Sequence, residues 1–379
     1  MSARQGPLNG IKVIELAGIG PGPYAGQLLA DMGADVIVVD RPGPALPKAV
    51  DGRGKRSIML DLKKPEAVEA LLKLVSGADV LIEGLRPGVT ERMGVGPEAC
   101  HAVNPKLIYG RMTGWGQTGP WSQMAGHDIN YISMTGVLNA IGKAGQPPVP
   151  PLNMVGDFGG GTMFLVTGIL AALVERMTTG KGNIVDAAII DGTHSLMSFV
   201  HGMAGLGQWR TDREANLLDG AAPFYRCYGT SDGKFMAVGC IEPQFFAAMM
   251  ERLPIDKEAF GGQHDQSKCA QQHKMLEDVF ASKSRDEWEA TFALTDACVT
   301  PVLDYVEAAS HPANAERKAV VKDGKWLHPQ IAPRLSSQTQ ADNFTIASRG
   351  GDYAAVLGEA GLAAGDIETL VSGGAVVTG

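Results

Sequence analysis

Residues 11–40 read IKVIELAGIGPGPYAGQLLADMGADVIVVD, and this stretch decides the fold. Residues 11–16 form an apolar run typical of a buried strand, and a turn rich in glycine and proline follows at 18–23. Residues 24–32 have a helical pattern, and 36–39 again resemble a strand. A strand, a loop, a helix and a second strand in this order open a parallel α/β sheet.

The same alternation continues through the first half of the chain. Further strands are expected at 79–82, 107–111 and 184–188, and further helices at 65–75, from the glycine run at 159–161 to about 177, and at 191–207. We therefore predict an α/β fold whose large domain is a doubly wound, Rossmann-like parallel sheet.

The pattern changes after this domain. The large domain is expected at 1–207, followed by a polar linker without periodicity at 208–222. Residues 223–335 are predicted to form a smaller α+β domain, which opens with a β-hairpin turning at 231–233. The tail, 336–379, is expected to return to the large domain.

Composition limits the functions that this chain can have. The net charge is −8, and the 379 residues contain no long run of lysine and arginine, which disfavours a nucleic acid or an anionic membrane as a partner. The five cysteines include no C-x-x-C pair, so neither a zinc site nor a disulfide framework is expected. The N-terminus lacks an apolar leader, and the apolar stretch at 164–174 is too short to span a bilayer. The expected location is the cytoplasm.

The first strand and turn imitate a dinucleotide-binding fingerprint. Gly18 and Gly20 follow a strand, and Asp40 ends the next strand, as in NAD-binding proteins. Pro23 occupies the position of the third glycine, and Arg41 follows the aspartate directly. We favour a tight turn in an α/β fold whose surface serves a different nucleotide.

Three titratable residues lie where a strand or loop meets a helix. His127 follows a loop rich in glycine, threonine and tryptophan, and a hydrogen-bonded structural histidine is the alternative interpretation. Asp157 precedes three glycines and a long apolar helix, so it could simply cap that helix. The glycines favour more than a cap, because they allow a backbone or a ligand to approach closely. Glu242 lies between a strand end and a helix start, and a cap is again the alternative.

The chain resembles the α-methylacyl-CoA racemases, members of the family III CoA-transferase superfamily, over nearly its whole length. The motif GHDINY at 126–131 marks the racemase branch, because transferase relatives generally lack the histidine. The other matching blocks include LNGIKVIELAGIGPGPYAGQLLADMGADVIVVDRP at 8–42, DVLIEGLRPGVTERMGVGP at 79–97, LIYGRMTGWGQTGP at 107–120, PPLNMVGDFGGGTMFLVTGILAAL at 150–173, GKGNIVDAAIIDGT at 180–193 and IEPQF at 241–245.

The resemblance implies racemisation of 2-methylacyl-CoA thioesters by two-base exchange of the α-proton. His127, supported by Glu242, would serve one face of the reacting carbon and Asp157 the other. Backbone N–H groups would hold the enolate oxygen, with the glycine run as a source. Neither a metal nor a redox cofactor is required, since the CoA belongs to the substrate. The alternative is a CoA-transferase in which Asp157 attacks the thioester and forms an acyl anhydride.

The resemblance also assigns residues to the CoA and a partner to the chain. An interlocked homodimer is implied, in which Glu242 reaches the site from the partner subunit. The residues implied to contact the CoA include four cations and the three segments 60–63, 84–86 and 126–131: Arg41, Leu60, Asp61, Leu62, Lys63, Gly84, Leu85, Arg86, Arg92, Gly126, Asp128, Ile129, Asn130 and Tyr131.

Overall fold

A computed structural model describes residues 6–45, 49–341 and 344–379. The predicted large domain also included residues 1–5 and 46–48, and the predicted tail included 342–343, all of which lie outside the described residues. The chain divides into two compact units. The first unit comprises Met1–Thr135, Pro151–Ser198 and Ala313–Gly379, and the second comprises Gly136–Pro150 and Phe199–Pro312.

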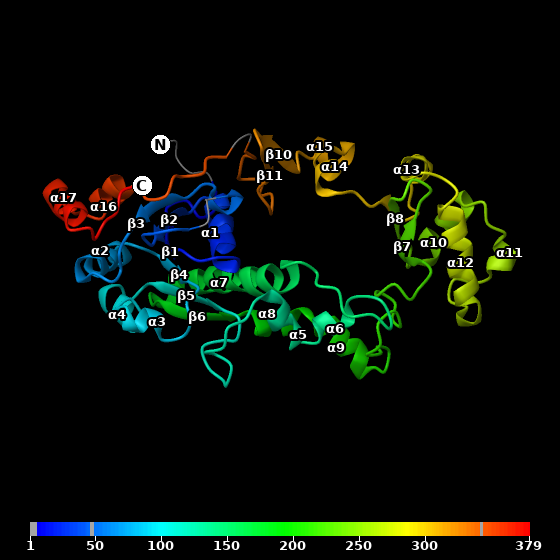
Figure 1. Ribbon diagram of the computed structural model, residues 1–379, viewed down its shortest axis with the longest axis horizontal. Coiled ribbons are helices and arrows are strands. Elements are labelled where there is room, and N and C mark those ends of the chain that lie inside the picture. Colours follow the sequence, from blue (N-terminus) through cyan, green and yellow to red (C-terminus); the bar gives the residue numbers. More distant parts are fainter. Residues whose placement is uncertain (1–5, 46–48, 342–343) are drawn as a thin grey trace. The chain divides into compact units, whose positions relative to one another are not determined.

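The first unit is built on a six-stranded parallel sheet (Figure 1). The order β3-β2-β1-β4-β5-β6 is that of the doubly wound fold with two mononucleotide-binding halves. The predicted Rossmann-like sheet is therefore confirmed. Its strands are β1 (Lys12–Leu16), β2 (Asp35–Asp40), β3 (Arg56–Met59), β4 (Val80–Glu83), β5 (Ile108–Thr113) and β6 (Asn183–Ala188).

Helices cover both faces of this sheet because successive strand residues point to opposite sides. Val13 and Val36 belong to one core cluster, whereas Ile14 and Ile37 belong to the other. On the side of Val13 the cover is α1 (Pro21–Asp31) and α7 (Met163–Thr179). On the side of Ile14 it is α2 (Pro65–Ser76), α4 (Pro97–Val103), α16 (Tyr353–Glu359) and α17 (Ala364–Ser372). The shorter helical segments of this unit are η1 (Val50–Gly52), α3 (Val89–Arg92), α5 (Asp128–Ser133), α8 (Ile189–Leu196) and α15 (Pro312–Glu316).

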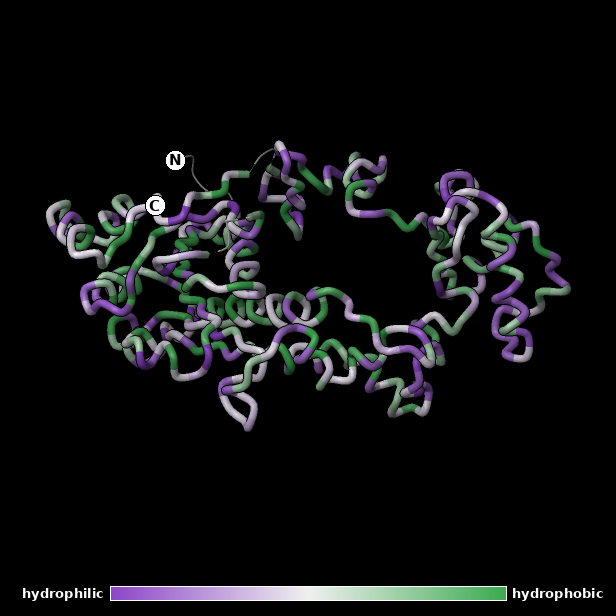
Figure 2. Tube along the Cα trace, viewed as in Figure 1, coloured by the Kyte–Doolittle hydropathy of each residue, from purple (hydrophilic) through white to green (hydrophobic). Residues whose placement is uncertain are grey.

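The longest helical segment extends beyond the apolar stretch 164–174 seen in the sequence. A π-helix, η2 (Met154–Thr162), runs directly into α7, so that Met154–Thr179 forms one segment of 26 residues, which contains an 18-residue window with a mean hydropathy of 1.6. Length and composition alone would allow this segment to cross a membrane. In the first unit it is a core helix, since Leu165 and Ile169 are fully buried against the sheet. Figure 2 shows the hydropathy of each residue along the chain, with green hydrophobic stretches in the region of the parallel sheet.

The second unit has its own sheet and its own core. β7 (Tyr225–Gly229), β8 (Phe235–Gly239) and β9 (Val299–Pro301) form an antiparallel sheet, which confirms the predicted hairpin. The core cluster contains Tyr228 stacked on Phe280 at 5.2 Å between ring centroids. The helices of this unit are α6 (Val137–Ala140), α9 (Ser198–Gly205), α10 (Pro243–Arg252), α11 (Lys257–Phe260), η3 (Gln266–Lys268), α12 (Cys269–Phe280), α13 (Arg285–Phe292) and α14 (Tyr305–Ser310).

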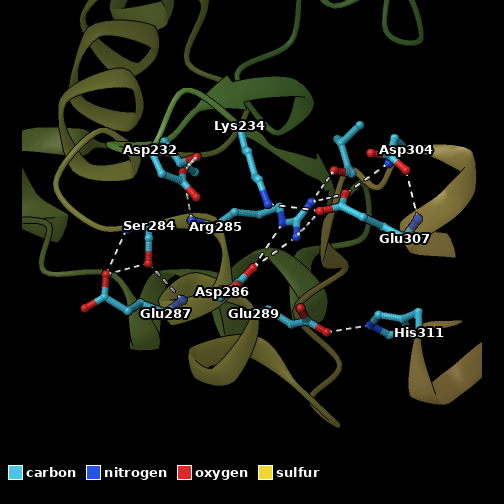
Figure 3. Close-up of polar contacts among 12 residues, drawn as sticks. Asp232, Lys234, Ser284, Arg285, Asp286, Glu287, Glu289, Asp304, Glu307 and His311 are labelled. Carbon is cyan, nitrogen blue, oxygen red and sulfur yellow. Dashed lines mark hydrogen bonds and ion pairs between the residues drawn. The ribbon is translucent and has the colours of Figure 1, made fainter.

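Ion pairs join the end of the hairpin to the last two helices of the second unit (Figure 3). The guanidinium of Arg285 lies 2.6 Å from Glu307, and Lys234 on the hairpin lies 2.9 Å from the same carboxylate. These two donors lower the pKa of Glu307 to about 2. The charge network thus fixes α13 and α14 against β8.

The unit boundaries differ from the ranges expected from sequence. Residues 136–150 and 199–207 belong to the second unit, and 313–335 belong to the first. This last segment contains the hairpin of β10 (Val320–Asp323) and β11 (Trp326–Pro329). It joins the first unit because Arg53 donates a hydrogen bond to the carbonyl of Pro329 at 2.5 Å.

Candidate active site

A cavity of about 1020 Å³ opens at the carboxyl ends of the central strands of the first unit. Leu16, Asp40 and Thr113, the last residues of β1, β2 and β5, all line it. In open α/β sheets ligands bind at this edge, where the strand order reverses. Here the reversal lies between β1 and β4, and the residues just after β4 also line the cavity.

His127 stands at the wall of this cavity, immediately before α5. Its backbone N–H donates to Oδ1 of Asn130 at 3.0 Å, which fixes the residue at the start of the helix. The hydroxyl of Tyr131 donates to the carbonyl of Gly126 at 2.5 Å and closes the same turn. The imidazole itself remains exposed.

Aromatic packing fixes the loop that leads to His127. The Trp115 ring makes edge contacts with Tyr131 at 4.8 Å and with Trp121 at 5.0 Å between centroids. Gly114 and Gly126 make room for the tyrosine ring, since a Cβ atom on them would lie 2.0 and 2.7 Å from it. The glycines and tryptophans of this loop therefore serve the geometry around the histidine.

Asp157 lies inside the π-helix, which already begins at Met154, so it is not the N-cap that the alternative interpretation assumed. π-Helical turns are often found at functional sites. The backbone N–H of Asp157 donates to Oδ1 of Asp128 at 2.6 Å, and Asn153 lies 3.4 Å from its Oδ2. Burial and the charge of Asp128 raise the pKa of Asp157, whereas Asn153 and His127 lower it.

The glycine-rich turn after β1 reaches the same carboxylate. Gly20 has a φ of 69°, and a Cβ atom there would lie 3.2 Å from Oδ2 of Asp157. Both residues line the cavity. The turn that imitates a dinucleotide fingerprint therefore makes room for Asp157.

The glycine run after Asp157 serves packing. A Cβ atom on Gly160 would lie 2.3 Å from Oγ1 of Thr193 in α8, and one on Gly192 would lie 1.9 Å from the carbonyl oxygen of Gly160. Among the described residues, those that line the cavity do not include 159–161. The close approach for which the glycines leave room is that of α8.

The cavity brings together part of the residue set that was expected at the CoA. Its lining contains Arg41, Gly84, Leu85, Arg86, Gly126 and Tyr131 beside His127 and Asp157. The other expected residues are not among the described residues that line it: Leu60, Asp61, Leu62, Lys63, Arg92, Asp128, Ile129 and Asn130. Leu60 is 1% exposed and bridges to Val376 in the tail. Asp128 instead contributes through its bond to Asp157.

Glu242 belongs to the second unit, directly before α10. Its side chain is exposed and makes no capping hydrogen bond to that helix. The capping alternative considered for this residue is therefore not what the structure shows.

Several residues at the cavity were missed in the sequence. Lys55 and Glu15 form a buried ion pair at 2.7 Å, and both line the cavity. Arg349, from the C-terminal segment, also lines it. Asn153 lies four positions before Asp157, at the spacing of neighbours on one helix face, and a helix predicted to begin earlier would have identified it. No local pattern marks the other three.

Comparison with known proteins gives the family. The profile of CoA-transferase family III matches residues 8–344. The chain is 46% identical over 330 residues to the α-methylacyl-CoA racemase of Mus musculus, covering 87% of this chain and 86% of the mouse protein. It is 44% identical over 338 residues to the α-methylacyl-CoA racemase of Homo sapiens, covering 89% of this chain and 88% of the human protein.

The fold agrees with this relationship. The crystal structure of a CAIB/BAIF family protein from Brucella suis superimposes with a TM-score of 0.81 at 27% identity, over 94% of this chain and all of that one. The profile match covers most of the sequence, including every residue that lines the cavity except Arg349. The chain belongs to CoA-transferase family III.

Proposed function

We propose that this chain is an α-methylacyl-CoA racemase that exchanges the α-proton of a 2-methylacyl-CoA through an enolate. One observation carries the proposal: His127 and Asp157 line the same cavity, in a chain that is 44–46% identical to two racemases. A transferase that works through an aspartyl anhydride does not require the histidine. Two-sided proton transfer uses both groups.

The two groups exchange roles with the direction of the reaction. In one direction, neutral His127 takes the proton from C2, and the electron pair of the C–H bond passes into the enolate. Protonated Asp157 then returns a proton to the opposite face and becomes a carboxylate. In the reverse direction the carboxylate removes the proton and the imidazolium returns one. The raised pKa of Asp157 favours the protonated form that the first direction needs.

Two cations of the cavity are suited to the phosphates of CoA. Arg41 and Arg86 both line the cavity, and they match the phosphates of a CoA thioester in charge. We propose no separate cofactor, because the reacting carbon is activated by its thioester carbonyl. A cytoplasmic location remains part of the proposal.

The partner of the chain is proposed to be a second copy of itself. Exposed apolar side chains gather where α7 lies beside the edge strand β6, with Val174 65%, Met177 84% and Ile184 48% exposed. Such a patch is typical of a surface that is covered in an assembly. Glu242, exposed and free of a capping role, would support His127 of the other copy in that dimer.

Deuterium exchange tests the activity. A pure enantiomer of a 2-methylacyl-CoA is incubated with the protein in deuterated water without a free carboxylic acid. We expect deuterium at C2 together with inversion, and we expect His127→Ala and Asp157→Ala each to reduce inversion by at least about 100-fold. Thioester exchange that appears only after a carboxylic acid is added, without deuterium uptake, would establish the transferase instead.

A further inference from the structure

Arg349 reaches the cavity at the carboxyl end of β2. Its guanidinium donates to the carbonyl of Arg41 at 2.6 Å and to that of Gly43 at 3.1 Å, and so holds the loop that follows the strand. Its Nε lies 3.6 Å from a carboxylate oxygen of Asp40 and is buried without a hydrogen-bond partner among the described residues. An arginine has five N–H donors, so these contacts do not exhaust it.

The position of Asp40 beside Arg349 indicates which ligand group the arginine could bind. An acidic residue at the end of β2 in a dinucleotide-binding fold accepts hydrogen bonds from a ribose hydroxyl, and an arginine nearby accommodates a phosphate on that ribose. Here Asp40 is 5% exposed, and the hydroxyl of Ser57 donates to it at 2.6 Å. A buried carboxylate that is already bonded and faces an arginine is poorly placed to read a hydroxyl group.

The segment that carries Arg349 is held firmly against the sheet. The N–H of Gly350 donates to Oγ of Ser57 at 2.8 Å, and the N–H of Ser57 donates to the carboxylate of Asp352 at 2.8 Å. Val377 pairs with the backbone of Met59 further along the tail. The residues that follow Arg349 are therefore fixed to β3, the neighbour of β2.

We propose that Arg349 binds the phosphate on the ribose of CoA and makes the site selective for CoA over dephospho-CoA. This inference rests on the proposed function, since it assumes that the cavity takes a CoA thioester. Arg41 lies beside it as a second cation at the cavity wall. Arg349 lies beyond residues 8–344, the part that matches the family profile, so membership of the family does not assign it a role.

Calorimetric titration of the full chain with CoA and with dephospho-CoA tests the inference. The wild type is expected to bind CoA more tightly. In Arg349→Gln, the affinity for CoA should fall about tenfold, because a charge-assisted hydrogen bond is lost, whereas the affinity for dephospho-CoA should change less than about twofold. Arg334→Gln is the matched control: it removes an exposed arginine from the same region and should leave both affinities unchanged.

The outcomes show whether Arg349 binds the phosphate or only holds the loop after β2. Equal losses for both ligands would mean that Arg349 only holds the loop, and an unchanged affinity for CoA would also overturn the inference. Arg349→Lys retains the charge and replaces the glutamine variant if that chain does not fold; it should weaken CoA binding selectively, by less than the glutamine variant. A wild type that binds neither ligand would overturn the proposed function, whereas one that binds both equally would overturn only the inference.

Discussion

Asp128 connects the two groups that we assign to proton transfer. It follows His127 in the chain, and its Oδ1 accepts the N–H of Asp157 at 2.6 Å. Gly156 leaves space for this contact, since a Cβ atom there would lie 2.4 Å from the same oxygen. One carboxylate thus sets both the position and the electrostatic surroundings of Asp157.

Asp128→Asn separates these two effects. The amide oxygen can still accept the N–H of Asp157, but the negative charge is gone. Since that charge raises the pKa of Asp157, its removal lowers this pKa, and the protonated form is lost at lower pH. The measurement is deuterium exchange of each enantiomer, which gives kcat/KM as a function of pH. We expect the limb of this profile that Asp157 controls to move to lower pH.

The control for this variant is a carboxylate far from the site. Asp366→Asn removes an exposed charge from α17 in the same unit and should leave both limbs in place. If the profile of Asp128→Asn coincided with that of the wild type, the charge of Asp128 would not govern Asp157.

At the scale of elements, the site depends on the contact between η2 and α8. Gly160 and Gly192 face each other across this contact, with no space for a methyl group on either. The π-helical segment that carries Asp157 is therefore positioned by a helix that follows it in the chain. A wider separation of the two elements would move the carboxylate relative to His127.

A pair of glycine substitutions tests this packing. Gly160→Ala places Cβ 2.3 Å from Oγ1 of Thr193 and should destabilise the protein by about 1–3 kcal/mol, as overpacking does. Gly202→Ala in α9 meets nothing within 4 Å and should stabilise the chain by about 0.5–1 kcal/mol, because alanine favours a helix. Denaturant unfolding measures both. Equal stability of the two variants would show that η2 and α8 can separate freely.

The sequence predicts elements whose contacts are local and misses those fixed by distant residues. The apolar runs and glycine turn of 11–40 were sufficient for β1, α1 and β2. β3 was not predicted, because Arg56 and Ser57 interrupt its apolar pattern. They are buried only through partners far away: Arg56 pairs with Asp35 at 2.5 Å, and Ser57 donates to Asp352.

The candidate site divides in the same way. His127 and Asp157 stand in motifs that the resemblance identified, and both line the cavity. Arg349 is brought there by a tail that pairs with β3 over nearly 300 positions of sequence, so no local pattern could reveal it. The π-helix also could not be predicted, because a glycine run indicates the start of a helix and does not distinguish π from α turns.

At the scale of the whole molecule, the two units are interleaved in sequence. The second unit takes residues from 136–150 and 199–312, so the chain passes between the units more than once. Each unit has its own apolar core. His127 and Asp157 belong to the first unit and Glu242 to the second. Whether the Glu242 that supports His127 comes from the same chain or from the second copy therefore depends on how the dimer assembles.

Mixed dimers answer this question. His127→Ala and Glu242→Ala chains with different tags are produced together, and the heterodimer is isolated by both tags. If Glu242 supports His127 of the other copy, one of the two sites is complete, and the heterodimer should show about half of the wild-type inversion rate. A heterodimer of His127→Ala with Asp157→Ala is the control, because both residues line one cavity of the same chain and neither site would be complete. Recovery in neither mixture would mean that Glu242 acts within its own chain or not at all.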